Sequence, residues 1–215
     1  MGSYKGAIFD VDGTILDSMH MWERVEVEYL LSLGITPRPG LHEDLRELGG
    51  SDIPAYFQRE YGIKDTPEEM SIRVNKLLEP FYFYEASLKD GAIEALDALR
   101  GRGVRMCAAT ATDRQLIEPA LKRCGAIDYF ETVFTCKEER TSKRLPDIYL
   151  RAADFLGTDI KSTLVFEDAL YAIKTACGAG FPVVGVFDPT SDDQQDEIMR
   201  LCRYYYRSLR DFSIL

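Results

Sequence analysis

Short, mostly apolar runs recur along the chain, and each ends in polar residues. These runs cover residues 6–9, 104–109, 132–135, 163–166 and 183–187. Such runs are typical of strands that are buried on both faces of a parallel sheet. Between them, apolar residues recur at helical spacing over residues 92–99, 116–124 and 148–156. The alternation over residues 88–190 therefore predicts an α/β fold, with a Rossmann-like parallel sheet core flanked by helices.

The stretch between the first two runs breaks this alternation because it contains no β-branched apolar run. A helical face around Trp22 is followed by Gly34 at a C-cap position. Ser51 is a candidate N-cap for a helix through residue 61, and Pro67 begins a helix that leads into the aromatic cluster 81–84. The polar run 190–197 leads into a last helix. We therefore predict an α/β core of residues 1–16 and 88–215, with residues 17–87 inserted as an α-helical cap domain.

Composition and charge narrow the function classes. The chain has 215 residues, of which 46% are hydrophobic and 29% charged, as in ordinary globular proteins. Its net charge of −10 disfavours a nucleic-acid or anionic-membrane surface, since both need clustered Lys and Arg. No run approaches the roughly 18 apolar residues that a membrane span requires. We expect neither partner, and any anionic ligand requires a local explanation.

The cysteines and histidines exclude several kinds of site. The 5 cysteines are odd in number and never spaced as Cys-x-x-Cys, which argues against a disulfide framework or a zinc ribbon. Free thiols in a reducing cytoplasm, without a signal peptide, are the simpler interpretation. With 2 histidines, a histidine-ligated metal or a Ser-His-Asp triad has little to build on. We expect a cytoplasmic monomer.

Polar residues follow four of the predicted strands where they end. Asp10 and Asp12 follow the first strand, the stretch Thr110-Ala111-Thr112 with its two hydroxyl groups follows the second, Lys143 the third, and the pair 167–168 the fourth. The carboxyl ends of parallel strands meet at one edge of a sheet, where open α/β folds bind ligands. Carboxylate oxygens suit Mg²⁺, which completes its shell with water and phosphate oxygens. The sequence therefore predicts a magnesium site beside a phosphate-binding site.

Two carboxylates at this edge can do different chemistry. One attacks phosphorus as a nucleophile, and the other protonates the leaving oxygen and then takes a proton from water. A carboxylate that approaches a phosphate is repelled by about 4 kcal/mol per pair of unit charges at 4 Å and an effective dielectric constant of 20. Mg²⁺ and Lys143 would offset this repulsion.

These motifs, in this order, resemble those of the haloacid-dehalogenase-like (HAD) phosphatases. Asp10-Val-Asp-Gly-Thr14 is similar to the first signature of that family, Thr110 to the second, Lys143 to the third and Glu167-Asp168 to the fourth. Arg144 stands where a proline often follows the lysine. The predicted insert resembles the cap of the subgroup with an α-helical cap. The resemblance covers essentially the whole chain.

The resemblance implies a role for each of these residues. Asp10 would be the nucleophile and a metal ligand, and Asp12 the general acid/base, which also offers its backbone carbonyl to the metal. Thr110, Ala111 and Lys143 would hold the phosphate. Asp168 would be a metal ligand, and Glu167 either a ligand or a neighbour of one. The cap would close over the site and supply much of the substrate specificity.

We therefore expect a Mg²⁺-dependent phosphatase that hydrolyses a small phosphorylated metabolite, a phosphomonoester of the sugar phosphate, phosphoglycolate or nucleotide type, through an aspartyl-phosphate. The rival is a β-phosphoglucomutase-like sugar-phosphate mutase, whose cap loop carries Ser followed by Arg; here Asp52 follows Ser51. A dehalogenase is disfavoured because it lacks the second acid, present here as Asp12. A receiver-like signalling phosphoacceptor is less favoured, because receivers are shorter and carry the acceptor after the third strand.

Overall fold

The computed structural model describes residues 4–46, 48 and 52–213. Its six-stranded sheet is parallel throughout, in the order β3-β2-β1-β4-β5-β6. The strands are β1 (Gly6–Phe9), β2 (Arg105–Thr110), β3 (Val133–Thr135), β4 (Thr163–Glu167), β5 (Val183–Val186) and β6 (Tyr204–Tyr206). The predicted α/β fold class is confirmed, as are the five predicted strands. The sixth strand, β6, is an addition to the prediction.

Helices cover both faces of the sheet. Phe9 on β1 packs in one apolar cluster with α5 (Ala92–Gly101) and α6 (Arg114–Arg123). Its neighbour Ile8 faces the other way, toward α7 (Asp147–Leu156), α8 (Leu170–Gly178) and α9 (Gln195–Leu201). Successive side chains of a strand point to opposite faces, so the continuous apolar runs provide a core on each side. In the described part of the chain, no helix is both long and apolar enough to cross a membrane.

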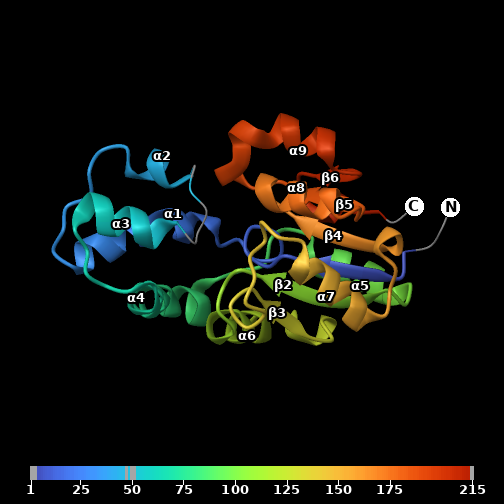
Figure 1. Ribbon diagram of the computed structural model, residues 1–215. Coiled ribbons are helices and arrows are strands. Elements are labelled where there is room, and N and C mark those ends of the chain that lie inside the picture. Colours follow the sequence, from blue (N-terminus) through green and yellow to red (C-terminus); the bar gives the residue numbers. More distant parts are fainter. Residues whose placement is uncertain (1–3, 47, 49–51, 214–215) are drawn as a thin grey trace.

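The segment after β1 is helical, as predicted. It contains α1 (Met19–Ser32), α2 (Leu41–Arg46), α3 (Ile53–Tyr61) and α4 (Pro67–Pro80), which lie to one side of the sheet in Figure 1. Thr66 caps α4 in a reciprocal capping box with Glu69. The short helix α2 was not predicted, and the proposed cap residue Ser51 lies outside the described residues. The helices enclose an apolar cluster of their own around Tyr29 and Phe57.

Two chain connections join these helices to the sheet, and they run side by side. Asp17 donates its backbone N–H to Ser87 O at 2.9 Å, and Lys89 donates to Ile15 O at the same distance of 2.9 Å. The predicted domain boundaries, between residues 16 and 17 and between 87 and 88, fall where these two connections pair. The division into two domains stays a prediction.

Candidate active site

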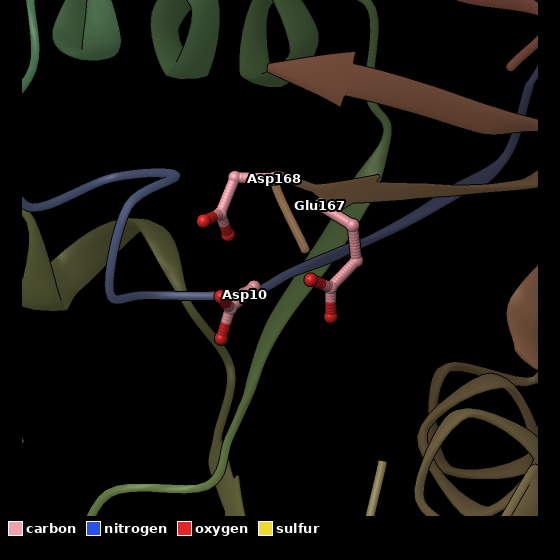
Figure 2. Close-up of side chains that lie close together, drawn as sticks. All are labelled: Asp10, Glu167 and Asp168. Atoms are coloured by element: carbon pink, nitrogen blue, oxygen red, sulfur yellow. The ribbon is translucent and has the colours of Figure 1, made fainter. Parts of the chain in front are cut away.

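Three carboxylates converge at the carboxyl edge of the sheet. Asp10 follows β1, and Glu167 and Asp168 lie at the end of β4, the neighbouring strand. All three are buried, and one oxygen from each lies within 4.8 Å of the others. Figure 2 shows the three side chains close together, Asp10 after one strand and Glu167 and Asp168 at the end of its neighbour. The structure thus brings together three of the residues that the sequence placed at strand ends.

Lys143 lies between two of these carboxylates. It follows β3 in a loop, yet it is buried and forms ion pairs with Asp10 and with Glu167 Oε1, the latter at 2.7 Å. Burial alone would lower the pKa of Lys143, but Asp10 and Glu167 raise it above its ordinary value. The ammonium group therefore stays charged, and it offsets part of the negative charge of the cluster.

Negative charge is nevertheless in excess here. Burial raises the pKa of Asp10 well above its ordinary value; Lys143 opposes this shift, while Glu167 and Asp168 add to it. Burial, followed by the charges of Glu167 and Asp188, raises the pKa of Asp168 to about 7. Glu167 Oε2 is buried and has no hydrogen-bond partner. An uncompensated acidic cluster with an unpartnered oxygen fits a cation that takes oxygen ligands.

The carboxylate of Asp12 has different surroundings. Its Oδ1 accepts hydrogen bonds from Ser18 Oγ at 2.6 Å and from Tyr82 Oη at 2.5 Å. Its Oδ2 accepts one from Thr112 Oγ1 at 2.7 Å. Three hydroxyl groups from three separate segments therefore hold this side chain, in contrast to the ion-paired Asp10.

Gly13 allows the chain to turn tightly against Asp168. It has a φ of 78°, which side chains rarely tolerate, and a Cβ at this position would lie 2.3 Å from Asp168 Oδ2. The next residue, Thr14, donates its hydroxyl to Asp168 Oδ1 at 3.2 Å. Gly13 and Thr14 of the first motif therefore hold the Asp168 side chain beside the end of β1.

The second motif lies at the end of β2. Thr110 is fully buried, and its hydroxyl accepts the backbone N–H of Thr112 at 3.1 Å, while Ala111 is exposed. Thr112 in turn binds Asp12, so this loop is tied to the loop after β1. Phosphate binding by Thr110 and Ala111 stays a prediction, as do the metal contact of the Asp12 carbonyl and the roles of the other site residues.

Two further contacts at this edge were missed in the sequence. Tyr149 Oη donates to Glu167 Oε1 at 2.7 Å, although its helical spacing suggested only a core residue. Lys89 Nζ lies 2.8 Å from Asp188 Oδ2, in a largely buried pair next to Asp168. Asp188 follows β5, so the rule that polar residues gather at strand ends could have found it.

A hollow of about 720 Å³ is lined by residues of α6 and by the chain at and after the end of β3. Asp113, Arg114, Thr135 and Lys137 are among its lining residues, which do not include the three clustered carboxylates. Its lysine and arginine charges are largely paired already; Lys137 Nζ, for example, lies 2.6 Å from Asp113 Oδ2. The acidic cluster, and not the hollow, is therefore the candidate active site. The cap-loop comparison rests on residues 48–52, of which 49–51, including Ser51, lie outside the described residues.

Comparison with known proteins identifies relatives over most of the chain. A family model described as haloacid dehalogenase-like hydrolase matches residues 4–180. Fructose-1-phosphate phosphatase YqaB of Escherichia coli strain K12 is 26% identical in an alignment of 195 residues that covers 85% of this chain and 96% of that protein. Phosphoglycolate phosphatase of Agrobacterium fabrum is 27% identical in an alignment of 189 residues that covers 84% of this chain and 79% of that protein.

Solved structures share the fold. CbbY from Rhodobacter sphaeroides, in complex with phosphate, superposes with a TM-score of 0.83 at 20% identity and covers 97% of this chain and 96% of its own. A putative β-phosphoglucomutase from Thermotoga maritima superposes with a TM-score of 0.74 at 21% identity, covering 96% and 95%. At these identities the similarity establishes a common architecture.

Proposed function

The chain belongs to the haloacid dehalogenase-like hydrolase family, and from this membership and the geometry of its site we propose that it is a Mg²⁺-dependent phosphatase of small phosphorylated metabolites. The family assignment confirms the resemblance that the motifs carried. One observation carries the proposal: Asp10 is a buried carboxylate that pairs with Lys143 and shares a cluster with two further carboxylates. This arrangement suits a nucleophile that must approach an anionic substrate.

In the proposed reaction, a carboxylate oxygen of Asp10 attacks phosphorus, and the bond between phosphorus and the ester oxygen breaks. Asp12 gives its proton to the departing oxygen. The product is an alcohol and an aspartyl-phosphate on Asp10. Asp12 then takes a proton from a water molecule that attacks this phosphorus, which releases inorganic phosphate and restores both carboxyl groups.

Charge compensation decides whether this attack is feasible. Lys143 contacts Asp10 directly, so its ammonium group reduces the repulsion between that carboxylate and a phosphate. Asp10, Asp168 and the unpartnered Oε2 of Glu167 would hold Mg²⁺, joined by the backbone carbonyl of Asp12. Bound Mg²⁺ supplies positive charge to the phosphate oxygens. Thr110 and the backbone at Ala111 would bind the remaining phosphate oxygens.

The names of the relatives support a substrate class. Besides the two phosphatases named above, for fructose 1-phosphate and phosphoglycolate, hexitol phosphatase B of Escherichia coli O157:H7 is similar to this chain, and all three names point to phosphomonoesters of small sugars, sugar alcohols or hydroxy acids. We therefore propose a phosphorylated sugar, sugar alcohol or phosphoglycolate as the substrate of this chain.

The test is phosphate release from fructose 1-phosphate, sorbitol 6-phosphate, phosphoglycolate and a nucleoside monophosphate, with Mg²⁺ and with chelator. We expect release that requires Mg²⁺ and that Asp10→Asn abolishes. Asp154→Asn, which removes an exposed carboxylate on α7, is the matched control and should retain activity. No release from any substrate with Mg²⁺, or full activity of Asp10→Asn, would refute the proposal. Isomerisation of β-glucose 1-phosphate without phosphate release would favour the mutase.

A further inference from the structure

Both connections between the sheet and the helices α1–α4 reach Asp12. Ser18, at the end of the first connection, donates to Asp12 Oδ1. Tyr82 lies in a π-helical turn, Phe81–Glu85, which begins the second connection, and donates to the same oxygen. This turn follows Pro80, which lacks an N–H; Ala86 N bonds to Phe81 O at 2.8 Å and closes the wider turn.

Tyr82 is held as a hydrogen-bond donor to Asp12. Its side chain is fully buried, and its hydroxyl oxygen accepts the indole N–H of Trp22 at 2.9 Å. Because Trp22 can only donate, the Tyr82 hydroxyl must direct its own hydrogen elsewhere, and Asp12 lies 2.5 Å away. Burial and the nearby charge of Asp12 raise the pKa of Tyr82 well above its ordinary value, so the phenol keeps its proton.

The hydrogen bonds distinguish the two oxygens of Asp12. A carboxylate oxygen has two lone pairs. Oδ1 uses both, for Ser18 and Tyr82, whereas Oδ2 accepts one bond from Thr112 and keeps one lone pair. Oδ2 is therefore the oxygen that is free to exchange a proton with a substrate, and the bonds to Oδ1 fix where Oδ2 points.

We propose that Tyr82, oriented by Trp22, is a positioning residue that anchors Asp12 Oδ1 so that Oδ2 faces the leaving oxygen of the substrate. The inference rests on the proposed function, in which Asp12 protonates that oxygen. Tyr82 contacts neither phosphate nor metal in this scheme. It acts through Asp12 and links the placement of the helices to proton transfer.

The proposal has a chemical signature that a general structural role lacks. An alkoxide leaving group needs a proton as its bond to phosphorus breaks, whereas p-nitrophenolate is stable as an anion and leaves without one. The ratio kcat/KM covers the steps through expulsion of the leaving group. Loss of Asp12 positioning should therefore lower kcat/KM for an alkyl phosphate far more than for p-nitrophenyl phosphate.

The experiment compares Tyr82→Phe with wild type on p-nitrophenyl phosphate and on the alkyl phosphate that wild type hydrolyses fastest. General acid catalysis contributes about 10²- to 10⁴-fold, and loss of positioning should remove about tenfold or more for the alkyl ester but less than about threefold for the aryl ester. Tyr84→Phe is the matched control, because Tyr84 lies in the same turn and is 77% exposed. It should change neither rate.

Trp22→Phe provides an independent test, since it removes the N–H that donates to the Tyr82 hydroxyl and keeps an aromatic ring. Like Tyr82→Phe, it should lower kcat/KM for the alkyl ester more than for the aryl ester, but by a smaller factor. The double variant Trp22→Phe/Tyr82→Phe should lose little more activity than Tyr82→Phe alone. Equal changes with both esters, or no change in either variant, would overturn the inference while leaving Asp10-dependent hydrolysis intact. Failure of the proposed function is distinct: wild type would hydrolyse neither ester, or Asp10→Asn would hydrolyse both.

Discussion

Replacing Lys143 with Met tests the electrostatic balance of the site most directly. The ammonium group pairs with Asp10 and Glu167, and it is almost fully enclosed. Met fills a similar volume but carries no charge, so Lys143→Met leaves two carboxylates without their cation. The variant therefore isolates the charge from the packing of the aliphatic stem.

The expected loss of stability is large. Removing one partner of a buried ion pair costs about 3–5 kcal/mol, because the remaining charge stays buried. At about 2–4 °C per kcal/mol for a chain of this size, the Tm should fall by roughly 6–20 °C. The loss should be smaller near pH 5.5 than near pH 8, because Lys143 lowers the pKa of Asp10 and its removal lets that carboxyl take up a proton more readily.

The assay is urea unfolding in chelator, with the Tm as a second measurement. Lys137→Met is the matched control in the same loop: Lys137 also pairs with a carboxylate, on Asp113, but its side chain is 63% exposed. Exposed pairs contribute about 0–1 kcal/mol, so the control should unfold almost like wild type. If Lys143→Met lost no more stability than this control, the buried pairs would not be compensating the cluster.

Three further predictions concern ionisation, backbone and core. Wild type in chelator should have a higher Tm near pH 5.5 than near pH 7.5: the folded-state pKa of Asp168 is raised to about 7, so folding takes up a proton there and stability falls as the pH rises from roughly 4 to 7. Mg²⁺ should reduce this slope, and a Tm independent of pH in chelator would contradict the reasoning. Gly91→Ala should lower the urea midpoint far more than Gly62→Ala, because both have positive φ but a Cβ at Gly91 would lie 1.8 Å from a backbone nitrogen, whereas Gly62 has open space; equal midpoints would be inconsistent with that clash. Phe9→Ala should lose about 3–5 kcal/mol in urea unfolding, because the ring is fully buried and stacks on Phe166 at 4.1 Å, and a loss below about 1 kcal/mol would show that the core closes around the gap.

The strand pattern could be predicted wherever burial on both faces produced an apolar run. Strand β6 was not predicted because its three tyrosines are only half-buried at the edge of the sheet, and only its pairing with β5 makes it a strand. The short helix α2 has too few turns for its periodicity to stand out.

Some contacts within the site could be predicted from the sequence and others could not. That Asp10, Glu167 and Asp168 meet follows from parallel strands ending at one edge, and this was predicted before any packing was known. Which residues hold the Asp12 carboxyl could not be predicted, because Ser18, Tyr82 and Thr112 lie 6, 70 and 100 positions away from it in the chain.

By itself, the sequence determined the α/β core, the helical segment after the first strand, the acidic residues of the site and their family. Those features depend on local patterns and on the shared direction of the strands. The tertiary structure alone decided that Lys143 lies between two carboxylates and that Tyr82 reaches Asp12 while Trp22 donates to the Tyr82 hydroxyl, although both aromatic residues looked like ordinary core residues. A hydrogen bond forms only where the distance between donor and acceptor is right to within a few tenths of an ångström, and only the packing of distant segments sets distances that finely.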